Sequence, residues 1–487
     1  MDVESFTPYL LHFVVLSVSL ALIYLVCNHK SNKNTTTNLP LGSKGLPFIG
    51  ETLAYIWASS KGVPEKFIND RKAKFSPDVF RTSLLGENMV VFCGSAGNKF
   101  IFSNQDKYVT SWWPTSVKKT LMFPSTTKTS AKDESNKLRS FLPPFLKPET
   151  LQHYVPIMDS MAKQHLDEFW SPFKQVKAFS LSKKYTFGLA CHFFISLDDP
   201  VEIAKLAEPY ERSNGRLSVP INLPGTSYNR AMKATKVIRS VLLEIVRKRH
   251  AEFTKNKDSC PQDLLTNMLL DRDENGEPMH EFDIVNKIIA LFIASHETSS
   301  TAVAFFVGYL AEYPHIYEAV RKEQMEIAKS KAPGDLLKWE DIQRMKYSWC
   351  VACEAMRLLP PANGGFREAI TDFTYKGFTI PKGWKTYWTV HSTNKNPQYY
   401  PEPEKFDPSR FEGDGPAPYT YVPFGGGPKM CPGKEFARLE ILVFIHNLVT
   451  RFKLEKLSPN ERITFIATPT PMEGLPIGLK PHQTPIA

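Results

Sequence analysis

The residues best suited to chemistry lie in one stretch near the C-terminus, residues 424–433, which read FGGGPKMCPG. Three consecutive glycines let a backbone approach a flat ligand closely, because no Cβ intervenes and positive φ carries little cost. Pro432 suits the first position of a helix, so we expect Cys431 at a helix N-terminus, where the helix dipole favours a thiolate. A thiolate is the form of cysteine that binds a metal ion.

Two other interpretations of this stretch compete with a metal site. A lone cysteine is often a small buried apolar residue. The glycines could instead cradle a phosphate, but Pro428 stands where a phosphate loop needs its first glycine, and Lys434 is followed by Glu435. The spacing F-x-x-G-x-[RK]-x-C-x-G resembles the haem-binding loop of the cytochrome P-450 monooxygenases, which implies heme b with Cys431 as the axial ligand of its iron. The other loop residues that this resemblance places at the haem are Phe424, Gly425, Lys429 and Gly433.

A second pair of residues carries opposite charges on one predicted helix. Glu354 and Arg357 are three positions apart and share a face, where a solvated pair contributes under about 1 kcal/mol. Residues 406–411, FDPSRF, resemble the second signature of the same family, whose arginine is Arg410 here. The resemblance implies that the three charged side chains form a buried structural triad beneath the haem loop. Removing one member of such a triad leaves a buried charge unpaired and costs roughly 3–5 kcal/mol.

A carboxylate and a hydroxyl are neighbours in the middle of a long predicted helix. Residues 294–299 read ASHETS, and a hydroxyl within a helix usually bonds the carbonyl four residues earlier, here Ala294. The same stretch resembles the family's oxygen-activating segment [AG]-G-x-[DE]-T-[TS], with Ser295 in place of the glycine. Because cleavage of O₂ consumes protons, the resemblance implies a proton relay through Thr298 that Glu297 connects to solvent. A local opening of the helix is expected to make room for oxygen and water.

The resemblance also assigns contacts around the haem and its substrate. Arg139 and Lys429 stand where the family commonly contacts a haem propionate, and the alternative for both is an ordinary solvated cation. Small and apolar linings suit a large rigid hydrocarbon, although aromatic residues at such positions are often plain core. The positions implied for the substrate pocket are Trp112, Trp113, Ala290, Ala294, Ala362, Gly364, Gly365, Pro469 and Thr470.

The N-terminal sequence predicts a membrane anchor. Residues 8–27 form an apolar run of about 20 residues, enough to cross the hydrocarbon core as a helix. A cleaved signal peptide is the alternative, but acidic residues precede the run and no clear cleavage site follows it. We expect an anchor at 1–28, a linker with a proline hinge at 29–48 and a haem-thiolate domain at 49–487. Lysines after the run place that domain in the cytosol, tethered by a single pass to the endoplasmic reticulum.

Composition and periodicity indicate a mainly α-helical protein with a small β-rich lobe. The 487 residues carry a formal charge of +10, and no basic run with interleaved aromatic residues suggests nucleic acid as a partner. The seven cysteines are scattered, so those other than Cys431 are interpreted as free thiols. A β-hairpin is expected from the runs at 79–85 and 89–93. Helices are expected at 132–142, 148–170, 201–214, 231–257, 281–313, 315–329, 346–359 and 431–452.

These motifs together make the chain similar to membrane-bound haem-thiolate monooxygenases. The resemblance implies electrons from an NADPH-dependent reductase, since nothing in the sequence suggests NADPH binding. Residues 358–385 and 423–449 are most similar to plant enzymes that oxidise triterpenes such as β-amyrin, including the β-amyrin 28-oxidases. A triterpenoid substrate is therefore expected, with the C-28 methyl oxidised through alcohol and aldehyde to acid. The alternatives are diterpenoid or steroid hydroxylation, a peroxide-consuming haem isomerase or dehydratase, and a non-enzymatic haem sensor or scaffold.

Overall fold

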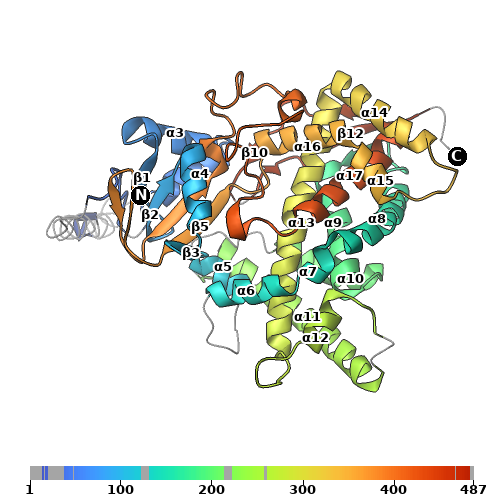
Figure 1. The fold of residues 1–487 in the computed structure, drawn as a ribbon, viewed down its shortest axis with the longest axis horizontal. Coiled ribbons are helices and arrows are strands. Elements are labelled where there is room, and N and C mark those ends of the chain that lie inside the picture. Colours follow the sequence, from blue (N-terminus) through green and yellow to red (C-terminus); the bar gives the residue numbers. More distant parts are fainter. Residues whose placement is uncertain are drawn as a thin grey trace, which may run out of the picture.

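A large helical body and a smaller lobe that contains most of the β-structure make up the molecule (Figure 1). The computed structural model describes residues 14–15, 17–19, 38–47, 49–121, 131–212, 222–256, 260–466 and 468–482. The long helix α13 (Glu281–Glu312) runs through the middle of the helical body. The expected fold class, mainly α with a small β-rich lobe, is confirmed.

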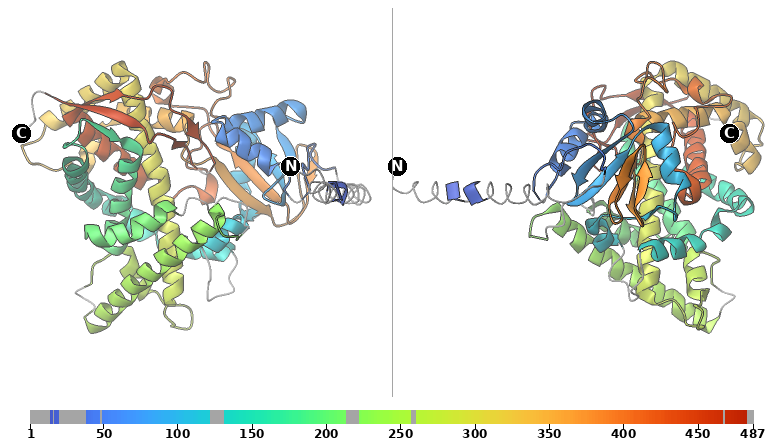
Figure 2. Two further views of the ribbon diagram at one scale, coloured as in Figure 1. Left: turned by 180° about the vertical axis from the view of Figure 1, so that it is seen from behind. Right: turned by 60° about the vertical axis from the view of Figure 1, so that its left-hand side comes forward.

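The smaller lobe is organised around a five-stranded sheet with the order β1-β2-β8-β5-β3. β1 and β2 form the expected hairpin, which turns at Leu85 and Gly86, both with positive φ. β8 pairs in parallel with β2 and antiparallel with β5, so early and late strands interleave, as the blue and orange arrows of Figure 2 show. The strands are β1 (Val79–Leu84), β2 (Glu87–Phe92), β3 (Val109–Ser111), β5 (Gly364–Ala369) and β8 (Lys385–Thr389). The helices of this lobe are α2 (Thr52–Ser60), α3 (Pro64–Lys74) and α4 (Gly94–Ser103).

The helical body packs around α13, most of whose side chains are buried. α9 (Ala178–Ile195) lies along it, and α16 (Lys346–Leu358) and α17 (Lys434–Arg451) complete the core. The remaining helices are α5 (Thr115–Leu121), α6 (Ala131–Ser140), α7 (Pro143–Leu146), α8 (Pro148–Phe169), α10 (Pro200–Arg212), α11 (Ser227–Lys255), α12 (Leu264–Leu270), α14 (Pro314–Lys329) and α15 (Trp339–Arg344). Small sheets contain β4 (Gln175–Lys177), β6 (Phe373–Tyr375), β7 (Phe378–Ile380), β9 (Phe452–Lys456), β10 (Ile463–Thr464), β11 (Thr470–Pro471) and β12 (Pro476–Pro481).

Two local expectations about helices are wrong. α17 begins at Lys434 with Gly433 as its N-cap, so Pro432 is not the first helical residue and Cys431 precedes the helix. The two residues between the thiol and the helix form a turn, which leaves Cys431 outside the first helical turn. α13 is a continuous α-helix through residues 294–299, without the expected local opening.

One helix among the described residues is long and apolar enough to cross a membrane, and it is α13. Because 67% of its most apolar window is buried inside the protein, its apolar character serves the core. The predicted anchor at 8–27 lies outside the described residues, apart from 14–15 and 17–19.

Candidate cofactor and active site

The cysteine loop is a compact turn that holds Cys431 by its own backbone. The Cys431 amide donates to the carbonyl of Phe424 at 2.8 Å, and the Gly425 amide donates to the carbonyl of Val422 at 3.0 Å. Gly427 has a φ of 65°, and a Cβ there would lie 2.3 Å from the carbonyl oxygen of Phe102 on α4. The glycines of the loop are therefore needed to pack it against α4.

The thiol of Cys431 lies at the end of this turn and is half-buried. Burial raises the pKa of Cys431, while the backbone N–H of Gly433 and the charge of Arg139 act in the opposite direction. This corrects the expectation that the N-terminus of a helix lowers that pKa. Within the described residues no group of three His, Cys, Asp or Glu side chains is arranged to hold a bare metal ion. A metal ligated by Cys431 therefore needs most of its ligands from a cofactor.

Two cations attach α6 to the cysteine loop. The Arg139 guanidinium donates to the carbonyls of Met430 and Lys429, each at 3.1 Å. The Lys429 ammonium donates to the side-chain oxygen of Asn136 on α6. Both residues are thus placed beside Cys431, as the resemblance implies, and their contact with a propionate stays a prediction.

A third cation, Arg367 on β5, belongs to the same site and was not predicted. Its Nε donates to Gln105 at 2.9 Å, and burial together with the nearby charge of Arg139 lowers its pKa to about 10. Two partly buried guanidinium groups that disfavour each other's charge are suited to bind an anion between them. One sequence signal could have indicated Arg367. It is a charged residue within a strand whose other side chains are mostly small or apolar.

Trp388 supplies further evidence of a missing partner. Its indole Nε1 is buried and has no hydrogen-bond partner among the described residues. A Cβ at Gly365 would lie 2.7 Å from that nitrogen, and one at Gly425 would lie 3.6 Å from the indole ring. The site thus combines a cysteine suited to ligate iron, two arginines suited to bind propionates, and a buried indole donor without a partner among the described residues. These groups fit a haem.

One stripe of α13 is left uncovered by the protein. Ala290, Ala294 and Thr298 are four positions apart, and they are half-buried or exposed although most of the helix is buried. The Thr298 hydroxyl donates to the Ala294 carbonyl at 2.9 Å, the helix-internal bond that is the alternative to a relay. Glu297 pairs at 3.5 Å with Lys183 of α9, and each side chain is 13% exposed. The carboxylate thus lies on the α9 side of the helix, adjacent to the uncovered stripe.

The structure brings together the three charged residues of the expected triad. Arg357 donates to both oxygens of Glu354, at 2.6 and 2.7 Å, and both side chains are 0% exposed. Arg410 lies 3.5 Å from Glu354 and is 12% exposed. Further hydrogen bonds from Arg357 reach the carbonyls of Asn394, Pro403 and Lys405. The triad therefore fixes the long irregular segment that leads to the cysteine loop.

The predicted pocket positions have different surroundings. Trp112 is 6% exposed and packs edge-on against Phe366, whereas Trp113 is 44% exposed. Gly364 has a φ of 147°, and a Cβ there would lie 2.1 Å from the carbonyl oxygen of Trp388. Packing against β8 is thus a sufficient reason for Gly364 and Gly365, independent of any substrate. Ala362 and Thr470 are half-buried, and Pro469 is buried.

Comparisons with known proteins agree over almost the whole chain. The Cytochrome P450 family profile matches residues 40–478. The beta-amyrin 28-monooxygenase of Saponaria officinalis is 55% identical over 96% of this chain and 96% of its own length. The Vitis vinifera beta-amyrin 28-monooxygenase is 54% identical over 99% of this chain and 100% of its own. The beta-amyrin 6-beta-monooxygenase of Solanum lycopersicum is 54% identical over 96% and 99%.

The solved structures include a similar fold. The retinoic acid bound cyanobacterial CYP120A1 gives a TM-score of 0.80 at 31% sequence identity. The match covers 92% of this chain and 100% of that chain, so it extends over both lobes.

Proposed function

Because the chain belongs to the cytochrome P450 family and is a haem-thiolate monooxygenase, we propose that it oxidises a triterpenoid scaffold of the β-amyrin type. The observation that supports this substrate most directly is identity of 52–55% with several beta-amyrin 28-monooxygenases over 96–99% of this chain. A rigid pentacyclic hydrocarbon binds mainly by burying apolar surface, at roughly 25 cal/mol per Å² before the costs of association.

We propose the C-28 methyl as the oxidised carbon, converted through alcohol and aldehyde to acid. Oxidation at carbon 6 is the second candidate, because the Solanum lycopersicum 6-beta-monooxygenase is as similar to this chain as the 28-monooxygenases are. One scaffold can yield either product, depending on which carbon faces the iron. The carbon that is oxidised therefore depends on how the pocket walls orient the substrate.

The residues of the site are given these roles in the proposal. Haem would supply the oxygen chemistry, and Cys431 would hold its iron as a thiolate. Arg139, Lys429 and Arg367 hold its propionates, which offsets the unfavourable burial of the two guanidinium groups. Thr298 releases its bond to Ala294 to pass a proton through Oγ1, and Glu297 takes up protons beside Lys183. Phe424, Gly425 and Gly433 shape the loop beneath the ring.

Membrane attachment and an electron-donating partner complete the proposal. Residues 1–28 anchor the chain in the endoplasmic reticulum, and an NADPH-dependent reductase supplies electrons on the cytosolic side. Leu53 and Trp57 are both over 50% exposed on one face of α2, and such an apolar face is suited to lie against the bilayer. Deletion of residues 1–28 is therefore expected to release the protein from membranes only partly.

Product analysis tests the substrate. The full chain is co-expressed with a reductase and supplied with β-amyrin, α-amyrin and lupeol, beside taxadiene and a steroid. We expect oxidised β-amyrin that carries a 28-hydroxyl, aldehyde or carboxyl group. Oxidation of only the diterpene or the steroid contradicts the triterpenoid proposal and leaves the monooxygenase activity intact.

Two substitutions test the site. Cys431→Ala is expected to abolish the red-shifted carbon monoxide band that a thiolate ligand gives to reduced haem. Thr298→Ala is expected to keep haem and substrate binding but to consume NADPH without forming product. If coupling of NADPH to product is unchanged, the hydroxyl serves only the helix, as its bond to Ala294 allows.

A further inference from the structure

Asn363 is the best-anchored residue of the segment 362–365 that leads into β5. Its backbone carbonyl accepts hydrogen bonds from the Thr389 hydroxyl at 2.8 Å, the Tyr387 hydroxyl at 3.1 Å and the Val390 amide at 3.3 Å. All three donors belong to β8 or the residue after it. The Asn363 carbonyl thus extends the pairing of β5 with β8, in which Gly364 and Gly365 lie opposite Thr389 and Trp388.

The side chain of Asn363 bonds in two other directions. Its Nδ2 donates to the carbonyl of Phe465 at 3.1 Å, and its Oδ1 lies 3.0 Å from Nε2 of His391. Burial lowers the pKa of His391 to about 3, so the ring is neutral. Because Nδ2 of Asn363 faces the Phe465 carbonyl, its Oδ1 faces Nε2 of His391, which must therefore carry the ring proton. The opposite orientation of the amide would face two acceptors toward each other at Phe465. Only one orientation satisfies both contacts.

Phe465 connects this side chain to the turn between β10 and β11. The Phe465 amide donates to the carbonyl of Ser59 on α2 at 2.8 Å, and Arg462 donates to the carbonyl of Ser60 at 2.8 Å. The Phe465 ring is buried edge-on to His391, with centroids 6.1 Å apart. Phe465 directly follows β10, so it attaches this end of the β10–β11 connection both to α2 and to Asn363.

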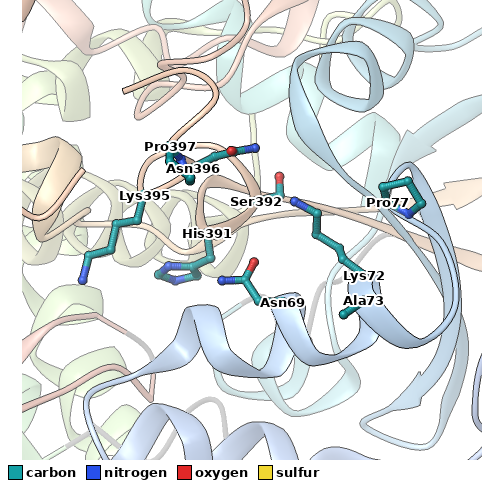
Figure 3. A pocket seen from close by; sticks show the side chains of 9 residues that line it. All are labelled: Asn69, Lys72, Ala73, Pro77, His391, Ser392, Lys395, Asn396 and Pro397. Carbon is teal, nitrogen blue, oxygen red and sulfur yellow. The ribbon is translucent and has the colours of Figure 1, made fainter. Parts of the chain in front are cut away.

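A cavity borders His391. It measures about 360 Å³ and is lined by α3 and the segment after β8, where His391 and Asn69 face the same space (Figure 3). The His391 imidazole therefore contacts Asn363 and Phe465 and also borders this cavity. The Asn363 amide links His391 to Phe465 beside it.

We propose that Asn363 is a positioning residue that sets the spacing between two walls of the substrate pocket, residues 362–365 and the turn at 468–471. The proposal rests on the proposed function and on the family resemblance, which places Ala362, Gly364 and Gly365 on one wall and Pro469 and Thr470 on the other. The side chain acts through the backbone of Phe465 and does not itself touch the substrate. Its loss lets the turn move, which changes how a rigid scaffold is presented to the iron and therefore which carbon is oxidised.

Three variants of the full chain test this role. Asn363→Asp keeps an acceptor for His391 but replaces the donor to Phe465 with an oxygen, and Asn363→Ala removes both contacts. Tyr387→Phe is the matched control, since it removes one of three donors to the Asn363 carbonyl and leaves the amide side chain in place. In the two Asn363 variants we expect the thiolate band with carbon monoxide to be retained, substrate affinity measured by spin-state change to fall roughly 2- to 10-fold, and the ratio of oxidised positions to change.

Amide hydrogen exchange in residues 468–472 supplies a readout that needs no substrate. We expect faster exchange in both Asn363 variants and wild-type exchange in Tyr387→Phe. Unchanged exchange, or faster exchange with an unchanged product ratio, overturns the proposal. If the wild type oxidises no triterpene, the proposed function fails separately, and the product ratio is measured on the scaffold that it does oxidise.

Discussion

Two glutamates of the helical body are equally buried but have opposite surroundings. Glu354 on α16 and Glu440 on α17 are each 0% exposed. Glu354 accepts two hydrogen bonds from Arg357 and one from the backbone amide of Asp407. Among the described residues neither carboxylate oxygen of Glu440 meets the geometry of a full hydrogen bond, and burial raises its pKa to about 8, an effect that the nearby Ser299 hydroxyl opposes only in part.

The difference shows that burial alone does not decide whether a carboxyl group keeps its charge. At Glu354 a guanidinium group and a backbone donor replace the water that an ionised carboxylate loses. At Glu440 neither a guanidinium group nor a backbone donor is found among the described residues, and the Ser299 hydroxyl is too weak a substitute, so burial favours the protonated form. The Glu354 carboxylate therefore links α16 to the irregular segment through its hydrogen bonds, whereas Glu440 is a neutral acid between α17 and α13.

Breaking the paired site is expected to give the largest effect. Arg357→Met removes both guanidinium hydrogen bonds to the buried Glu354 and leaves it only Arg410 at 3.5 Å and the backbone amide of Asp407. We expect this to cost about 3–5 kcal/mol of folding stability. We expect loss of haem incorporation and of folded protein, measured by the carbon monoxide spectrum and by urea denaturation. Stable, haem-loaded Arg357→Met protein would contradict a structural role for the triad.

Replacing Glu440 with a neutral residue is expected to change how folding stability depends on pH. The folded-state pKa of Glu440 is raised from 4.5 to about 8, so its contribution to stability is present below pH 4.5 and is lost as pH rises toward 8. Glu440→Gln cannot ionise, so its stability relative to wild type should rise by about 1.4 kcal/mol per pH unit between these values and level off above 8. Thermal melting from pH 5 to 9 measures this slope.

A matched control is available on the same helix. Glu435→Gln changes a side chain that is 46% exposed and pairs with Arg438. Its melting temperature relative to wild type should hardly depend on pH over the same range. A slope for Glu440→Gln that is no steeper than for this control would show that Glu440 is ionised in the folded protein.

A smaller loss of stability is expected at Arg410, the most exposed member of the triad. Arg410→Gln removes the more exposed cation, while Glu354 keeps Arg357 and the amide of Asp407. We expect a loss of about 1.5 kcal/mol, because a hydrogen bond or ion pair to a charged group is lost without leaving that charge unpaired. Urea denaturation of the haem-loaded protein measures it, and a loss as large as that of Arg357→Met would contradict the ranking of the two arginines.

The smallest effect is expected at a solvated pair on α3. Lys66 and Asp70 lie 3.0 Å apart, but their side chains are 53% and 56% exposed. Lys66→Ala should lower stability by less than about 0.5 kcal/mol, since water screens the pair. A larger loss in the same urea assay would mean that exposure does not govern the value of charge pairs in this protein.

Much of the fold follows from local patterns in the sequence. The helices with one apolar face, such as α11 and α14, were predicted to within a few residues at each end, because their periodicity is a direct record of the buried face. α9 was not predicted, because apolar residues lie on all its faces and no single face marks its period. The start of α17 was predicted three residues early, since Pro432 occupies a turn instead of the helix.

The site was predictable where one short motif contains it. Cys431 and its loop, and the pair of Glu354 and Arg357, are local in sequence and were placed together as expected. Arg367 and Trp388 join the site only because β5 and β8 are neighbours in the sheet, a pairing that no local pattern encodes. The surroundings of Glu440 could not be predicted either, since they depend on which side chains of other helices pack against α17.

The interleaved order of the five-stranded sheet has a consequence during synthesis. Met89 of β2 pairs with Lys385 of β8, so the first hairpin emerges from the ribosome about 300 residues before its central neighbour. At about 5–20 residues per second, its inner edge waits roughly 15–60 s without a strand partner. The nascent chain must therefore protect an open β-edge, by a chaperone or by early contacts with α2, α3 and α4, until the last quarter of the protein arrives. We therefore expect newly made chains to aggregate more readily than the mature protein.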